Sequence, residues 1–112
     1  MQPLTDVQKE QIRAQMVRIA NDAADKLFNK QEEKGNHRGL SDEGLDRAFV
    51  EELQEFVVAE GIARKDPTVE NMRGLYGELI DLFNVSFMSY DTLSCNRGER
   101  LNAHLSPDGQ ST

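Results

Sequence analysis

The chain has 112 residues, of which 38% are hydrophobic and 29% charged, and its formal net charge is −7. This length suits one domain with a modest core, and the composition excludes a disordered chain. Apolar runs such as Phe56–Ala59 are too short to span a bilayer, and the single cysteine, Cys95, excludes an internal disulfide. The N-terminus resembles no signal peptide, so a reducing cytoplasm is the expected location.

The negative charge is concentrated in one segment. Residues 41–60 have one basic and seven acidic side chains, whereas residues 1–40 have seven basic and six acidic ones. An acidic surface repels the phosphate backbone of nucleic acids, so duplex nucleic acid is excluded as a partner. Cations, or the basic surface of another protein, are the partners that this charge favours.

The first predicted helix begins after Thr5, which forms a capping box with Gln8, and ends before Gly35. Val17 and Phe28 lie on an adjacent apolar face and favour self-association, as in a homodimer. The main apolar residues recur at spacings of three and four, which is typical of a narrow coiled-coil seam: Ile12, Met16, Ile19, Ala23 and Leu27.

The second predicted helix is capped by Ser41 and closed by the basic pair Arg64–Lys65. Asp66, Pro67 and Thr68 then cap the third helix. One face of the second helix is apolar: Leu45, Phe49, Leu53, Phe56 and Val57. The third helix has the broadest apolar face, which predicts packing on more than one side: Val69, Met72, Tyr76, Leu79, Ile80, Phe83, Phe87 and Tyr90.

The C-terminal region is expected to add little to the fold. Leu101, Ala103 and Leu105 permit a short final helix, and residues 106–112 are expected to form a flexible tail. No segment alternates with a period of two. The sequence therefore predicts an all-α fold, with a single helical domain over residues 1–105. This domain has three long helices and a short C-terminal one, in a bundle completed by homo-oligomerisation.

Two acidic motifs lie on the second and third predicted helices. Glu51, Glu52 and Glu55 form an E-E-x-x-E pattern, and Glu78 and Asp81 form an E-x-x-D pattern. Residues three apart are neighbours on a helix, so each motif presents a pair of carboxylates, and antiparallel packing would let the pairs face each other. Oxygen ligands without thiol or imidazole indicate Mg²⁺ or Mn²⁺. The expected chemistry is attack by a metal-activated water on a phosphoanhydride.

These motifs, separated by twenty-two residues, resemble those of the MazG-type, all-α nucleoside triphosphate pyrophosphohydrolases. The resemblance covers residues 45–90 and extends to the apolar residues between the acids. It implies that Mg²⁺ is bound, that water attacks a nucleotide substrate, and that a nucleoside monophosphate and pyrophosphate are released. It also implies that Glu52, Glu55, Glu78 and Asp81 are metal ligands. Glu51 would be an auxiliary ligand or the base that orients the water.

Two further expectations concern the residues around the second motif. Gly74 and Gly77 share a helix face with Glu78 and Asp81, and would leave an open strip that a ligand or helix can approach. On a helical wheel, however, the two acids point nearly opposite the main apolar stripe. We therefore expect a lone three-helix packing to leave them in solvent, so that a second chain or the C-terminal segment must cover the site.

The basic residues that would hold a triphosphate are identified only by elimination. Lys26 and Lys30 on the first helix are candidates, as are Arg97 and Arg100 near the C-terminus. Because the chain has only two histidines, a histidine metal site is an unfavourable interpretation. His37, between two glycines, is expected to be an exposed loop residue, and Cys95 to be an incidental thiol.

Alternative interpretations remain for the acidic motifs. A glutamate-rich helix face is commonly a solvated surface. The chain could accordingly be a non-catalytic acidic helical module that binds a basic protein partner, like regulators found on phages and plasmids. Glu51, Glu52 and Glu55 would then be the contact surface. A catalytically inactive relative of the pyrophosphohydrolases is a third possibility.

Overall fold

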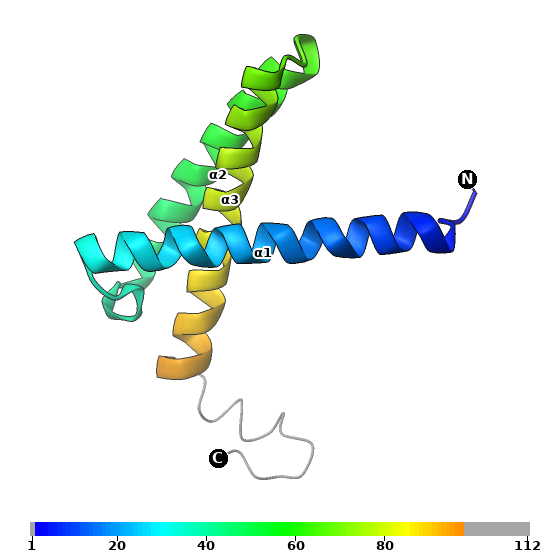
Figure 1. The fold of residues 1–112 in the computed structure, drawn as a ribbon. Helices are drawn as coiled ribbons and strands as arrows, with labels where there is room; N and C mark the ends of the chain where they lie inside the picture. The colour runs from blue at the N-terminus through cyan, green and yellow to red at the C-terminus, as the bar shows by residue number, and fades with distance from the viewer. Residues whose placement is uncertain (1, 98–112) are drawn as a thin grey trace, which may run out of the picture.

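The computed structural model describes residues 2–97, which form five helical elements (Figure 1). They are α1 (Asp6–Lys34), the 3₁₀ turn η1 (His37–Gly39), α2 (Asp42–Lys65), α3 (Val69–Thr92) and the π-helical segment η2 (Leu93–Arg97). The described residues contain no strand, which confirms the all-α prediction with three long helices. The predicted short helix around Leu101–Leu105 and the tail over residues 106–112 lie outside the described residues.

The helix ends follow the predicted capping residues. The Thr5 hydroxyl accepts a hydrogen bond from the Gln8 amide at 3.1 Å, and the Gln8 side chain accepts one from the Thr5 amide at 2.9 Å. Ser41 and Thr68 likewise accept from the amides three residues later. Gly35 ends α1 with φ of 92°, in the left-handed region that favours glycine. Local chemistry therefore sets where each helix begins and where α1 ends.

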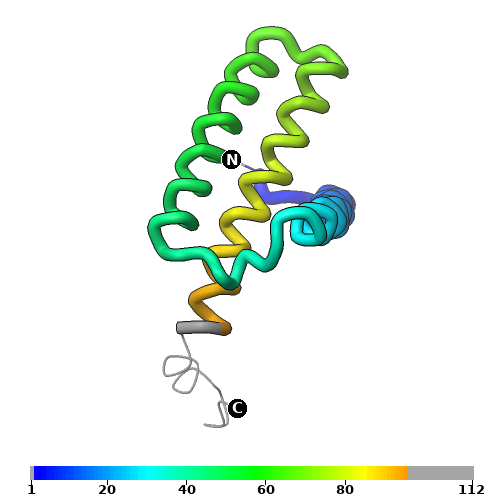
Figure 2. Tube along the Cα trace, turned by 90° about the vertical axis from the view of Figure 1, so that its left-hand side faces the viewer, coloured from blue at the N-terminus to red at the C-terminus, as the bar shows by residue number. Residues whose placement is uncertain are grey.

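The three helices form an antiparallel α2/α3 hairpin that α1 crosses at a steep angle (Figures 1 and 2). α3 lies between the other two helices, and Figure 2 shows α1 almost end-on beside it. The N-terminal half of α1 extends away from the hairpin, and every residue from Gln2 to Arg18 is exposed. In the described part of the chain, no helix is both long and apolar enough to cross a bilayer.

The core is small because α1 crosses α3 instead of lying along it. Only the crossing covers α1, so the predicted seam is buried at Ala23 and Leu27, whereas Ile12 and Met16 are 41% and 65% exposed. Val17 and Phe28, which favour self-association in the sequence, are also exposed. The apolar residues that are buried are Ala23, Leu27, Leu45, Ala63, Ile80 and Val85.

The expectation that the acids of α3 point into solvent is wrong. Glu78 is half-buried, and the Asp81 side chain is only 16% exposed. Phe83 and Tyr90, from the apolar stripe, are instead 44% and 71% exposed. The reason is that α2 and α1 cover two different strips of α3, and the acids lie between these strips. α1 of the same chain thus shields Asp81, whereas Glu78 lies against α2.

His37 is a buried anchor, and the prediction of an exposed loop residue is wrong. Its ring is 9% exposed, lies edge-on to Phe87, and places Nε2 2.7 Å from an Asp91 carboxylate oxygen, while Nδ1 contacts Gln31. Arg38 donates to both oxygens of Asp91 at 2.8 and 3.0 Å. These hydrogen bonds hold the pKa of Asp91 well below its ordinary value, and the bond from Arg38 has the largest effect. The loop after α1 is thereby fastened to the C-terminal end of α3.

Candidate metal centre

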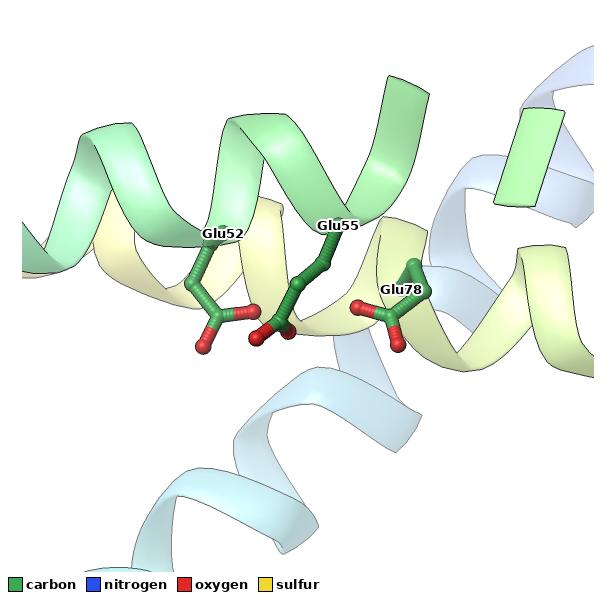
Figure 3. A group of neighbouring side chains, drawn as sticks. All are labelled: Glu52, Glu55 and Glu78. Atoms are coloured by element: carbon green, nitrogen blue, oxygen red, sulfur yellow. The ribbon is translucent and has the colours of Figure 1, made fainter. Parts of the chain in front are cut away.

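Three of the four predicted ligands converge between α2 and α3. Glu52 and Glu55 lie one turn apart on α2, and the antiparallel hairpin places Glu78 of α3 opposite them. One carboxylate oxygen from each of the three lies within 4.8 Å of the others. Figure 3 shows the side chains reaching from both helices into one shared space. We call Glu52, Glu55 and Glu78 the carboxylate cluster.

Two oxygens of the carboxylate cluster are buried without a hydrogen-bond partner. They are Oε2 of Glu52 and Oε2 of Glu78, and no donor from the described residues reaches either. Leaving a buried acceptor unpaired costs about 1–3 kcal/mol, and more when the group is charged. Glu55 is the exposed member of the cluster, so the space opens to solvent on its side. An oxygen-binding cation would satisfy both buried atoms, and the cluster therefore fits such an ion.

The pKa values of the cluster also favour a bound cation. Burial raises the pKa of Glu52, and the negative charges of Asp81 and then Glu55 raise it further. The pKa of Glu78 is also raised, by burial first and then by the charges of Glu55 and Asp81. Both shifts reflect desolvation and repulsion among like charges. A divalent cation would remove the repulsion that these carboxylates impose on one another.

Asp81 is outside the carboxylate cluster, and it pairs with two lysines of α1. Its Oδ1 atom lies 2.6 Å from Nζ of Lys26 and 3.6 Å from Nζ of Lys30. Both lysines are predicted substrate-binding residues, and they pair with Asp81, which follows Glu78 of the cluster by one turn of α3. Glu51 is exposed and is outside the cluster. Of the two predicted arginines, Arg97 ends η2 and Arg100 lies outside the described residues.

A cavity of about 320 Å³ adjoins the cluster at Glu52. Asp81 and Glu52 line one side of it, and Lys30 and Lys34 are the cationic residues of its lining. The remaining wall includes the amide side chains Gln31 and Asn84 and five apolar residues, Leu27, Leu40, Ala48, Val85 and Met88. Binding sites for small molecules commonly combine an apolar lining with a few polar groups in a cavity of this size. The cavity therefore offers a partly apolar molecule both ammonium and carboxylate groups as binding partners.

Two lining residues were missed in the sequence, although each has a recognisable spacing. Lys34 follows Lys30 by four residues, as Lys30 follows Lys26, so three lysines form one row on α1. Like charges four apart destabilise an isolated helix, and Asp81 offsets this repulsion at Lys26 and Lys30. Asn84 follows Asp81 by three residues and shares its helix face. It donates to the Ala23 carbonyl at 2.9 Å, which fixes α1 against α3.

The open strip predicted beside Glu78 is confirmed. A Cβ atom added at Gly74 or at Gly77 would have no atom within 4 Å from elsewhere in the chain. A further shallow hollow beside this strip is lined by Glu55, Val58, Ile62 and Glu78, among others. The cluster is therefore accessible from outside on this side as well as from the cavity.

Neither a protein-family model, nor a curated protein sequence, nor a solved structure matches the chain. The interpretation of the cluster consequently depends on the residues and geometry described above.

Proposed function

We propose that this chain is a Mg²⁺- or Mn²⁺-dependent hydrolase that cleaves nucleoside triphosphates to a nucleoside monophosphate and pyrophosphate. The observation that carries the proposal is the carboxylate cluster of Glu52, Glu55 and Glu78, with two buried unpaired oxygens, beside a cavity that contains lysines. The sequence resemblance over residues 45–90 supports the same activity.

The ligand set determines which cation is proposed. Three carboxylates supply only oxygen atoms, which Mg²⁺ and Mn²⁺ prefer, and leave coordination positions for water and phosphate oxygens. When bound, the cation supplies positive charge to a phosphoanhydride and makes water a stronger acid. Glu51, which is exposed one turn before Glu55 on α2, would be the group that accepts a proton from the attacking water.

The cavity next to Glu52 has the chemistry that a nucleotide requires. Lys30 and Lys34 would neutralise phosphate oxygens, and Asp81 holds the ammonium groups of Lys26 and Lys30 close to the cluster. The apolar wall around Leu27 and Met88 would accept the flat face of a base. The polyphosphate would then lie between the lysine row and the cluster, which is the arrangement that its hydrolysis needs.

The test is pyrophosphate release from a panel of nucleoside triphosphates with Mg²⁺, for the wild type and three variants. Glu52→Gln and Glu78→Gln preserve shape but remove a ligand charge, and each is expected to lower activity at least about a hundredfold. Glu43→Gln, at an exposed position of α2 outside the cluster, is the matched control and keeps full activity. Full activity in both cluster variants, or no pyrophosphate from any nucleotide, would contradict the proposal.

A second candidate function is binding of a basic protein through α2. The observation that favours it is the exposure of acidic side chains on this helix. Asp46, Glu51 and Glu55 are all exposed on this helix, within the segment that concentrates the negative charge. Reversing Glu43 and Asp46 to lysine, two exposed positions of α2 outside the cluster, would abolish such binding without affecting metal-dependent hydrolysis. A partner that is retained by this double variant, or released by chelating Mg²⁺, would argue against this second function.

A further inference from the structure

Asp81 has the charge and the position of a further metal ligand, but two ammonium groups already contact it. It follows Glu78 of the carboxylate cluster by one turn of α3. Lys26 and Lys30 of α1 both approach the same oxygen of Asp81, Oδ1, at 2.6 and 3.6 Å. These contacts lie where α1 crosses α3. The crossing therefore brings two positive charges to the edge of the cluster.

The contact between Lys26 and Asp81 supplies charge without a well-formed hydrogen bond. Oδ1 of Asp81 is buried, and no donor in residues 2–97 reaches it with hydrogen-bond geometry, although Nζ of Lys26 is only 2.6 Å away. An ammonium is a point charge on a flexible stem, and the Lys26 side chain is 40% exposed, so it can move away from this oxygen. A divalent cation has twice the charge and binds carboxylate oxygens directly. Asp81 is thus paired with a group that a metal ion can replace.

The charges of Asp81 and of the two lysines act on the carboxylate cluster. Burial is the largest cause of the raised pKa of Glu52, the charge of Asp81 raises this pKa further, and the charge of Lys30 lowers it. For Glu78, burial is again the largest cause of the raised pKa, Asp81 adds to it, and Lys26 opposes it. Asp81 therefore increases the negative charge around both glutamates, and each lysine offsets that charge at one of them.

The position of the lysines decides how strongly this region attracts a cation. The three carboxylates of the cluster and that of Asp81 are accompanied by two ammonium groups, so the formal charge is −2. Without the two ammonium groups it would be −4, and the attraction for a cation would be greater. The phosphates of a nucleotide can draw the ammonium groups away, because they offer more negative charge and more acceptor oxygens than one carboxylate.

We propose that Lys26 and Lys30 are an internal counter-ion of the metal site and compete with the divalent cation for Asp81. In the free protein their ammonium groups occupy Asp81 and keep metal binding weak. When phosphates draw these groups away, Asp81 becomes free to bind the cation as a fourth carboxylate. Metal and polyphosphate then strengthen each other's binding, since such coupling is reciprocal. This regulation rests on the proposed function of the cluster as a metal site.

The row of three lysines on α1 provides a matched test. Lys26→Met and Lys30→Met each remove an ammonium group that contacts Asp81, with little change in the length of the side chain. Lys34→Met makes the same change one turn further along the row, where the lysine lines the cavity but does not belong to this ion pair. Lys26→Arg keeps the positive charge beside Asp81.

Electron paramagnetic resonance of free Mn²⁺, titrated into each protein without nucleotide, measures the metal dissociation constant independently of hydrolysis. Lys26→Met is expected to bind Mn²⁺ about tenfold more tightly than the wild type, because a positive charge beside the site is removed. Lys30→Met, whose ammonium is more distant from Asp81, is expected to gain less. We expect Lys34→Met and Lys26→Arg to bind Mn²⁺ as the wild type does. Circular dichroism verifies that each variant is helical.

The displacement of the lysines by phosphate has its own measurement. Nucleoside monophosphates chelate Mn²⁺ only weakly, so they can be added to the same titration. A monophosphate that binds is expected to tighten Mn²⁺ binding by the wild type, and to do so less in Lys26→Met, where no ammonium remains to be displaced from the nearer position. An equal effect on both proteins would contradict the displacement.

Two results of the metal titration would overturn the proposal. One is Mn²⁺ binding by Lys26→Met and Lys30→Met that is no tighter than binding by the wild type. The other is an equal gain in Lys34→Met, which would indicate a general effect of removing positive charge from α1.

The same experiments separate this proposal from that of the hydrolase. Pyrophosphate release by the wild type, without tighter Mn²⁺ binding in Lys26→Met, would support the hydrolase and overturn the internal counter-ion. Tighter binding in Lys26→Met, in a protein that hydrolyses no nucleotide, would support the counter-ion and contradict the hydrolase. Absence of Mn²⁺ binding in the wild type and in all variants would contradict both.

Discussion

At the scale of single residues, the candidate site is defined by carboxylates that are costly to the fold. Glu52 and Glu78 each bury an oxygen without a donor, and burial raises the pKa of both. A raised pKa means that the folded chain binds more protons than the unfolded chain. The free energy of unfolding therefore falls as the pH rises from the ordinary glutamate pKa of 4.5 through the raised one. Such a cost is expected at a site that a cation completes.

The first prediction follows from this cost. Without metal at neutral pH, Glu52→Gln is expected to stabilise the protein by up to about 1 kcal/mol, which raises the melting temperature of a chain this size by about 4–8 °C. The gain is expected to vanish near pH 4, where the wild-type carboxyl is protonated as well. Mg²⁺ is expected to raise the melting temperature of the wild type but not that of the variant.

Thermal melts in chelator and in Mg²⁺, at acidic and neutral pH, measure these differences. Glu43→Gln, at an exposed position of the same helix, is the control and should melt like the wild type in both. A Glu52→Gln variant that melts below the wild type in chelator would show that the carboxylate is already compensated without a cation.

Asp91 differs from Glu52 and Glu78, because hydrogen-bond donors within the fold compensate its charge. Arg38 and His37 bond to it and lower its pKa. Its contribution to stability is therefore present above the ordinary aspartate pKa of 3.8 and is lost as the pH falls below it.

Asp91→Asn is accordingly expected to cost about 1–2 kcal/mol at neutral pH, because the charged hydrogen bonds that fasten the loop to α3 are weakened. Urea denaturation should show the wild type and the variant converging as the pH falls below 3.8. Asp46→Asn, at an exposed position of α2, serves as the comparison and should cost little. Equal stability of Asp91→Asn and wild type at neutral pH would contradict this anchoring role.

At the scale of elements, the angle between α1 and the hairpin decides which surfaces are covered. α1 supplies Lys26 and Lys30 to Asp81 at the crossing, and it leaves its own N-terminal half exposed. An isolated helical segment of this length is marginal in water, so its order depends on the rest of α1. The hairpin in turn supplies the carboxylate cluster, because antiparallel packing puts Glu78 opposite Glu52 and Glu55.

Gly74 and Gly77 allow a prediction at this scale. Both lie inside α3, and an added Cβ would meet nothing within 4 Å at either position. Gly74→Ala and Gly77→Ala are each expected to stabilise the fold by about 0.5–1 kcal/mol through helix propensity alone. Gly61→Ala in α2, where the space is also open, is the reference for that gain. Chemical denaturation measures all three, and a loss of stability at Gly77 alone would show that another chain or segment packs on the strip.

At the scale of the whole molecule, the described residues bury few large apolar side chains completely. Six of these residues form the buried apolar core, of which only Leu27, Leu45 and Ile80 have side chains larger than valine. Several large apolar residues, among them Phe49, Phe83 and Phe87, are more than a third exposed. The homo-oligomer that the sequence predicts would cover part of this exposed apolar surface, so that folding and association would be linked.

A folding reaction linked to association depends on protein concentration. We expect the melting temperature of the wild type to rise as the protein concentration increases, because only folded chains associate with one another. Differential scanning calorimetry at several concentrations provides the measurement, and a constant wild-type melting temperature would contradict the linkage.

The sequence by itself determined the helices and the chemistry of the site. Caps and helix ends at Thr5, Gly35, Ser41 and Thr68 depend on neighbours a few residues away, so local patterns were sufficient to predict them. The pairing of Glu52 with Glu55 is also local, because residues three apart on a helix are always close. The facing of Glu78 required only that α2 and α3 pack antiparallel, which the short connection between them favours.

Only the tertiary structure decided how the faces of these helices are used. The sequence expected a buried apolar stripe on α3 and exposed acids, whereas Asp81 is covered and Phe83 is not. It likewise expected His37 in solvent, and a bond to Asp91 buries it. Periodicity reports which residues share a face, but the direction from which a distant helix arrives depends on contacts across the whole chain. The steep crossing of α1 depends on such contacts, and it covers Asp81 while Phe83 stays exposed.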